Sequence, residues 1–110
     1  MTYQHKELAS GRWNNLTLME QMANIGSEVA RTMSWEKKKN TDYCRRAFER
    51  ALELLDLTIA DNKNIHRLNE LTRLREVLAD YFLFDNIYNS NEKNMQNYFL
   101  AFNYAARIKA

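Results

Sequence analysis

The chain has 110 residues, 16 of them basic and 14 acidic, which gives a formal net charge of +2. This length fits one domain, and the proportions of charged (27%) and hydrophobic (45%) residues exclude a disordered chain. The small net charge gives no argument for polyanion binding, and a single cysteine, Cys44, excludes a disulfide within the chain. We therefore expect a cytoplasmic protein in a reducing compartment.

Residues 1–16 give the weakest structural signal. We expect a tail or a short helical turn over residues 3–9 that stops at Gly11, and Trp13 should dock on the body of the protein. The segment lacks the apolar run of a signal peptide, and no stretch approaches the ~18 consecutive apolar residues of a membrane span. No membrane partner is expected.

Residues 17–110 are predicted to form a helical domain whose first helix begins at Thr17. Thr17 and Glu20 have the spacing of a capping box, in which each side chain binds the other residue's backbone N–H. Apolar residues then recur at intervals of three and four, as on one face of a helix. Gly26 lies in this face and costs about 1 kcal/mol relative to alanine, so we expect a second helix to cross closely there.

The second predicted helix, residues 40–61, organises the rest of the chain. It contains no glycine or proline, and its apolar residues form two adjacent stripes rather than one. The stripes comprise Cys44, Ala47, Ala51, Leu54 and Thr58, and Phe48, Leu52, Leu55 and Ile59. Because two stripes need cover from two sides, this helix should be the inner member of a bundle.

A third helix is predicted over residues 65–84 and a fourth over residues 92–107, with Asn89 or Ser90 as the cap of the fourth. In the third helix, Arg75 falls within an apolar stripe, where an unpaired guanidinium would be costly. We therefore expect Arg75 to reach solvent or an acid. Glu28 of the first helix is the candidate partner in a polar core pair.

Four helices of similar length with short connections predict an all-α fold, an up-down-up-down antiparallel four-helix bundle. Bundles can bind metal ions through inward Glu and Glu-x-x-His residues, but the chain has no Glu-x-x-His pattern. A phosphate-binding glycine loop, a nucleophile elbow and a zinc-binding cysteine pair are also missing from the sequence. We expect no cofactor, no metal site and no catalytic activity.

One group of basic residues is a candidate for nucleic-acid binding. It surrounds the first predicted turn and comprises Lys37, Lys38, Lys39, Arg45 and Arg46. Trp35 and Tyr43 lie close by in the sequence and could stack on bases. However, Glu36 and Asp42 interrupt the patch, and cations are favourable at a helix C-terminus in any case. We favour a solvated helix end over an RNA-binding surface.

Several short segments of the sequence are similar to segments of known proteins. They are GRW at residues 11–13, MANIGSEV at 22–29, AFERALELLD at 47–56, RLREVL at 73–78 and DYF at 80–82. They resemble a group of short bacterial helical-bundle proteins of unassigned function, over most of residues 11–107. The resemblance implies no activity and no site residues. The chain also distantly resembles the HEPN class, but residues 59–61 hold no Arg before His66, so the catalytic motif of that class is missing.

Two functions from different classes remain open. We prefer a non-catalytic protein that acts through protein–protein interaction, as an adaptor or a self-associating module, with another protein or a second copy as partner. Its motivation is a surplus of apolar residues beyond one core: Leu16, Leu18, Trp35, Ile87, Tyr88 and Tyr104. The alternative is an RNA-binding or inactive HEPN-like protein, related to ribonucleases, that uses the basic turn.

Overall fold

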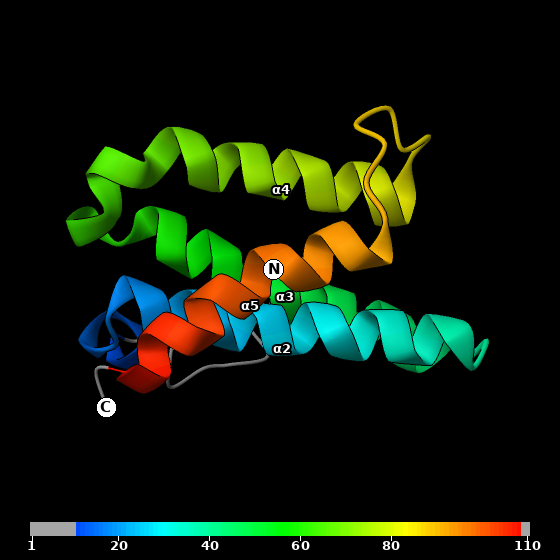
Figure 1. The fold of residues 1–110 in the computed structure, drawn as a ribbon, viewed down its shortest axis with the longest axis horizontal. Helices are drawn as coiled ribbons and strands as arrows, with labels where there is room; N and C mark the ends of the chain where they lie inside the picture. Colours follow the sequence, from blue (N-terminus) through cyan, green and yellow to red (C-terminus); the bar gives the residue numbers. More distant parts are fainter. Residues whose placement is uncertain (1–10, 109–110) are drawn as a thin grey trace.

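The computed structural model describes residues 11–108, which contain helices and no β-strand. The four α-helices are α2 (Leu18–Lys37), α3 (Thr41–Ala60), α4 (Leu68–Leu83) and α5 (Glu92–Ile108). Two 3₁₀-helices, η1 (Arg12–Asn15) and η2 (Asn62–Arg67), precede α2 and α4 (Figure 1). The predicted all-α class is confirmed, whereas the turn expected over residues 3–9 lies outside the described residues.

The ends of the helices follow from side chains that bind free backbone groups. The capping box at α2 is confirmed, because the Glu20 amide donates to Thr17 Oγ1 at 3.2 Å and the Thr17 amide donates to Glu20 Oε1 at 2.9 Å. At the start of α3, the Tyr43 amide donates to the side chain of Asn40 at 3.1 Å. Such caps satisfy donors that have no partner inside the helix.

The expected cap of α5 is wrong. The Asn94 amide donates to Asn91 Oδ1 at 2.8 Å, so the capping side chain comes one or two residues after the expected positions, Ser90 and Asn89. Asn89 instead has a φ of 54°, the left-handed conformation, which asparagine adopts more readily than most residues. It therefore belongs to the turn that precedes the helix.

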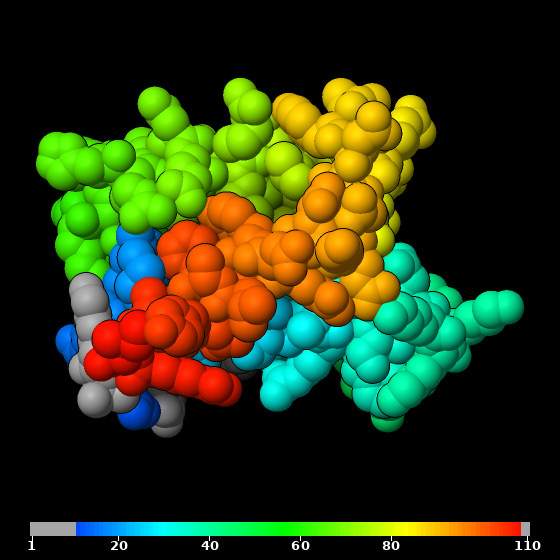
Figure 2. Space-filling view, viewed as in Figure 1, coloured from blue at the N-terminus to red at the C-terminus, as the bar shows by residue number. Residues whose placement is uncertain are grey.

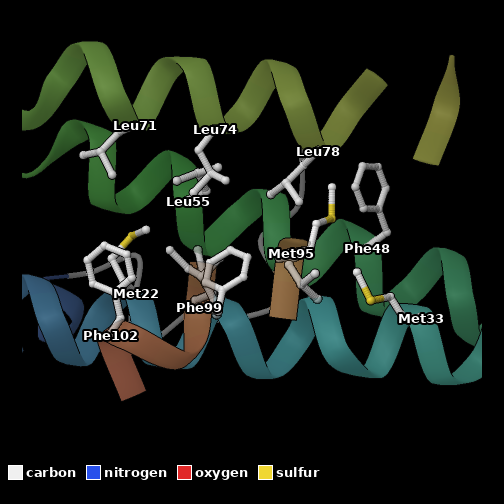
Figure 3. Packing of buried hydrophobic residues seen from close by; sticks show 14 of the residues in the cluster. Met22, Met33, Phe48, Leu55, Leu71, Leu74, Leu78, Met95, Phe99 and Phe102 are labelled. Carbon is white, nitrogen blue, oxygen red and sulfur yellow. The ribbon is translucent and has the colours of Figure 1, made fainter. Parts of the chain in front are cut away.

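The core lies between α3 and its neighbours. Helix α3 packs against both α2 and α4, and α5 packs against α2 (Figure 1). Both predicted stripes of α3 contribute buried residues, among them Phe48 and Leu54, as expected for a helix that is covered from two sides. Figure 3 shows side chains from all four α-helices meeting in this core, including Met22, Leu55, Leu78 and Phe99.

The close crossing expected at Gly26 is confirmed. A Cβ added to Gly26 would lie 2.8 Å from the Cβ of Phe99, a residue of α5 that is itself buried. That distance is shorter than carbon atoms tolerate, so glycine allows α5 to lie against α2. The helix-propensity cost of Gly26 is thereby offset by packing.

Candidate functional site

The expected pair of Glu28 and Arg75 is wrong. Arg75 of α4 donates to Asp56 of α3, with Nε 2.7 Å from Oδ1 and Nη2 3.3 Å from Oδ2. Glu28 of α2 accepts hydrogen bonds from Arg31 at 2.9 Å and from Arg50 of α3 at 3.3 Å. Because α3 packs between α2 and α4, each of the two charges meets a nearer partner.

The residues of the predicted basic patch lie at the turn between α2 and α3, together with two aromatic rings. The rings of Trp35 and Tyr43 contact each other edge to face, with centroids 4.8 Å apart. Lys38 Nζ lies 4.9 Å from the centre of the Trp35 ring, and Arg46 Cζ lies 5.7 Å from that of Tyr43. Lys39 has a φ of 58° and turns the chain from one helix into the next.

Acidic side chains also engage this patch. Asp42 accepts from Arg45 at 3.2 Å and lies 3.3 Å from a guanidinium nitrogen of Arg46. Lys37 Nζ lies 2.5 Å from Glu92 Oε1, at the start of α5. The cations and rings thus contact one another and nearby carboxylates, which leaves the patch less suited to phosphates than its sequence suggests.

At the other end of the helices, a buried polar cluster joins η1 to η2. Trp13 Nε1 donates to Thr58 Oγ1 at 2.9 Å, and Gln21 Nε2 donates to Asp61 Oδ2 at 2.9 Å. Asn64 Nδ2 donates to Gln21 Oε1 at 2.9 Å and to the carbonyl of Thr58 at 3.0 Å. All five residues are buried and satisfy one another, so the cluster holds the fold together and does not face a ligand.

Asp61 is the ionisable member of this cluster. Burial raises the pKa of its carboxyl, but hydrogen bonds from Lys63 and Gln21 outweigh that effect and hold the pKa below its usual value. Lys63 Nζ donates both to Asp61 and to the carbonyl of Asn14, at 3.2 Å in the second case. The ionised carboxylate therefore ties η1 to the connection between α3 and α4.

A second buried carboxylate, Asp80, organises the loop between α4 and α5. Its Oδ1 accepts from the Ile87 amide at 2.9 Å and its Oδ2 from the Tyr88 amide at 3.1 Å. Its backbone carbonyl accepts from the amides of Phe84 and Asn86, each at 3.2 Å. One residue at the end of α4 thus fixes four backbone amides of the loop.

Asparagine completes the loop. Asn86, like Asn89, has a φ of 54°, and its side chain exchanges two hydrogen bonds of 2.9 Å with the backbone of Ser90. The sequence between α4 and α5 reads as a polar connection, and its asparagines were the only signal of this ordered turn. Sequence reasoning missed Asp80, because a carboxylate near a helix end usually faces solvent.

This hydrogen-bonded loop and the end of α4 hold apolar side chains in solvent. Those that are exposed are Leu83, Phe84, Ile87 and Tyr88. Phe84 is 72% exposed and Ile87 is 78% exposed, and the loop projects at one corner of the molecule (Figure 2). Of the surplus apolar residues named above, Leu16 and Leu18 pack on the core, whereas Ile87 and Tyr88 do not.

Tyr88 lines two hollows. Its hydroxyl donates to Glu76 Oε2 at 3.1 Å, and Arg73 Cζ lies 5.8 Å from its ring centre. A hollow of about 270 Å³ lies on the side of α5, and one of about 580 Å³ lies beside Phe84 and Ile87. The apolar lining of the first consists of Leu74, Val77, Met95 and Phe99. Apolar groups could enter both.

Two polar side chains of the smaller hollow, Tyr98 and Glu70, are paired with each other. Tyr98 Oη donates to Glu70 Oε2 at 2.7 Å, and Arg67 Nε donates to Glu70 Oε1 at 2.9 Å. Burial, followed by the bond to Glu70, raises the pKa of Tyr98, so the phenol stays protonated. This pair can orient a bound group, but it provides no activated nucleophile.

Within residues 11–108, no group of three or more His, Cys, Asp or Glu side chains is placed to hold a metal ion. None of the helices described combines the length and apolar character that crossing a membrane requires. Comparison with models of protein families, with curated proteins and with solved structures finds no match to this chain.

Proposed function

We propose that this chain is an up-down-up-down antiparallel four-helix bundle that binds another protein, without catalysis, through the loop between α4 and α5. The ion pair between Lys37 and Glu92 supports the arrangement, because it joins the end of α2 to the start of α5. The short connections of α2 to α3 and of α3 to α4 also favour antiparallel neighbours.

The single observation that carries the function is the exposure of Phe84 and Ile87 on a backbone fixed by Asp80. Exposed aromatic and aliphatic side chains lower the free energy of binding when a partner removes them from water. A backbone that is already ordered loses little entropy on binding, which improves affinity. The two hollows beside Tyr88 would accept apolar side chains of the partner.

RNA binding through the basic turn is the weaker proposal. Lys38 and Arg46 lie over the rings of Trp35 and Tyr43, and Asp42 binds two of the arginines. Phosphate would have to compete with these contacts, and bases would have to compete for the rings. A titration with single-stranded RNA at low salt should show no saturable binding.

The experiment that tests the proposal compares two serine variants as baits in extracts of the cells that make the protein. Ile87→Ser changes the loop, whereas Ile65→Ser changes an isoleucine of η2 that is also exposed, 62% against 78% for Ile87. A partner that is retained by the wild type and by Ile65→Ser, but lost with Ile87→Ser, supports the proposal. Retention by both variants, or no partner with the wild type, would overturn it.

A further inference from the structure

The larger hollow beside Tyr88, of about 580 Å³, has an apolar lining that is open to solvent. Phe84 and Ile87, 72% and 78% exposed, form part of this lining together with Ala79 of α4. The loop that carries them projects at a corner of the molecule (Figure 2), where another protein can reach it. An occupant of the hollow must therefore offer apolar surface, and the charges around the hollow decide which kind of side chain brings it.

Carboxylates outnumber cations in the lining of this hollow. One cation, Arg75, stands against Glu76, Asp80 and Asp85, which leaves a formal charge of −2 in a chain whose total is +2. Arg75 is already bound by Asp56, through contacts of 2.7 and 3.3 Å, so it does not offset the other three. An acidic hollow attracts a positively charged occupant and repels a negatively charged one.

The carboxylate of Asp85 is available for contact with such an occupant. Both oxygens of Asp80 accept backbone amides, while Glu76 Oε2 accepts from Tyr88 Oη at 3.1 Å and lies 3.9 Å from Arg73 Nε. The side chain of Asp85 is exposed and forms no hydrogen bond or ion pair with any other residue that the structure describes. A cation can therefore bind Asp85 without breaking a contact within the protein.

The ring of Phe84 favours arginine as that cation. Other rings at the surface of this chain already have a cation over them, with Lys38 Nζ 4.9 Å from the centre of the Trp35 ring and Arg73 Cζ 5.8 Å from that of Tyr88. Among the described residues, no cation lies over the ring of Phe84. A guanidinium stacks on an aromatic face, binds a carboxylate through two N–H groups and has an apolar stem, whereas an ammonium group is not planar.

We propose that the protein segment bound by this loop carries an arginine that enters the larger hollow. Its stem lies on Ile87, and its guanidinium stacks on Phe84 and pairs with Asp85, the next residue in the chain. Because Tyr88 lines both hollows, an apolar side chain beside this arginine can enter the smaller one. The inference rests on the function proposed above and specifies the chemistry of the segment that the loop recognises.

Three short peptides test the inference: acetyl-Leu-Arg-Leu-amide and its two analogues with citrulline or glutamate in the central position. Citrulline has the shape of arginine without its charge, and a leucine on each side lets either neighbour reach the smaller hollow. NMR titration of the isotope-labelled protein at low salt measures binding. We expect the arginine peptide to shift the amides of Asp85 and Ile87 with a dissociation constant of about 1 mM. The citrulline peptide should bind about fivefold more weakly, and the glutamate peptide should not saturate.

Two variants test the contacts that give this preference. Asp85→Asn removes the charge, and Phe84→Leu keeps an apolar side chain but removes the ring face. Both positions are exposed, so the fold should be unchanged. Each variant should reduce the preference for arginine over citrulline from about fivefold to about twofold or less. Glu36→Gln, at an exposed acid near the end of α2, is the matched control and should keep the preference of the wild type.

The inference is overturned if the arginine and citrulline peptides bind equally, if Asp85→Asn keeps the preference of the wild type, or if the arginine peptide leaves the amides of the loop unchanged. The bait experiment described above separates this failure from failure of the proposed function. A partner that depends on Ile87 but is retained equally by the wild type and by Asp85→Lys would contradict the arginine and leave the function standing. A wild type that retains no partner would overturn the function itself.

Discussion

Two connections of this chain are each built around a buried aspartate, yet one is closed and the other faces outward. Around Asp61, the indole of Trp13 is buried and η1 covers the connection. Around Asp80, four backbone amides of the loop also bind one residue, but Phe84 and Ile87 project into solvent. The comparison teaches that a connection can have its backbone held by hydrogen bonds without having its side chains buried. A connection whose backbone is hydrogen-bonded and which still exposes apolar groups is suited to recognition.

The largest loss of stability is expected at the closed connection, the one around Asp61. Among the described residues Trp13 has the most buried aromatic ring. Trp13→Ala leaves a cavity and removes the indole N–H that donates to Thr58 Oγ1, so we expect a loss of about 3–5 kcal/mol in the free energy of unfolding. Chemical denaturation measures it. Trp13→Phe, which fills much of the space but cannot donate to Thr58, should lose less. A loss below about 1 kcal/mol for the alanine variant would mean that η1 does not cover this connection.

At the open connection, Asp80→Ala should cost less, about 1–3 kcal/mol, because it removes the acceptors of two backbone amides and leaves the core in place. The amides of Ile87 and Tyr88 should then exchange with solvent faster, as measured by NMR. Asp85→Ala, at an exposed position of the same loop, is the control and should change neither quantity. Unchanged exchange in the Asp80 variant would contradict the role given to its carboxylate.

The closed connection should also weaken in acid. Because the pKa of Asp61 is lowered in the folded protein, its stabilisation is complete above the unfolded value of 3.8 and is lost as the pH falls below it towards the folded pKa. Asp61→Asn cannot titrate, so its stability should fall less between about pH 5 and pH 3. Denaturation curves of both proteins at several pH values measure the difference. If the wild type and Asp61→Asn lost the same stability over this pH range, Lys63 and Gln21 would not stabilise the ionised carboxylate.

The smallest change in stability is expected for the exposed isoleucines, one of which lies in each connection. Ile87→Ser and Ile65→Ser should each change the free energy of unfolding by no more than about 0.5 kcal/mol, because neither side chain is buried. Thermal unfolding of the two variants measures this. A large loss for Ile87→Ser would mean that the side chain packs on the protein, and the loop would no longer qualify as a binding surface.

Features that depend on neighbours in the sequence could be predicted. The capping box of Thr17 and Glu20, the two stripes of α3 and the close crossing at Gly26 follow from spacing and from the size of single residues. The cap of α5 was misassigned by one or two residues, since several adjacent asparagines could serve and only the backbone conformation distinguishes them. Patterns of this kind predict that a helix is present more reliably than they predict the residue at which it begins.

Features that join distant segments could not be predicted. Arg75 was expected to meet Glu28. The pattern predicted that α3 is covered from two sides, but it does not say which helices cover those sides, and α3 in fact lies between α2 and α4. Trp13 was expected to be buried, but Gln21 and Asn64, its partners in the polar cluster, are ordinary polar residues whose meeting depends on the three-dimensional fold. The surplus of apolar residues was visible in the sequence, but which of them stay exposed was decided by packing.

The most direct test of the account is a photoreactive amino acid placed at position 87 in cells that make the protein, with position 65 as the matched control. We predict that irradiation joins position 87, and not position 65, to a defined protein of different sequence. Adducts at both positions, or at neither, would contradict the claim that the loop between α4 and α5 is where this protein binds its partner.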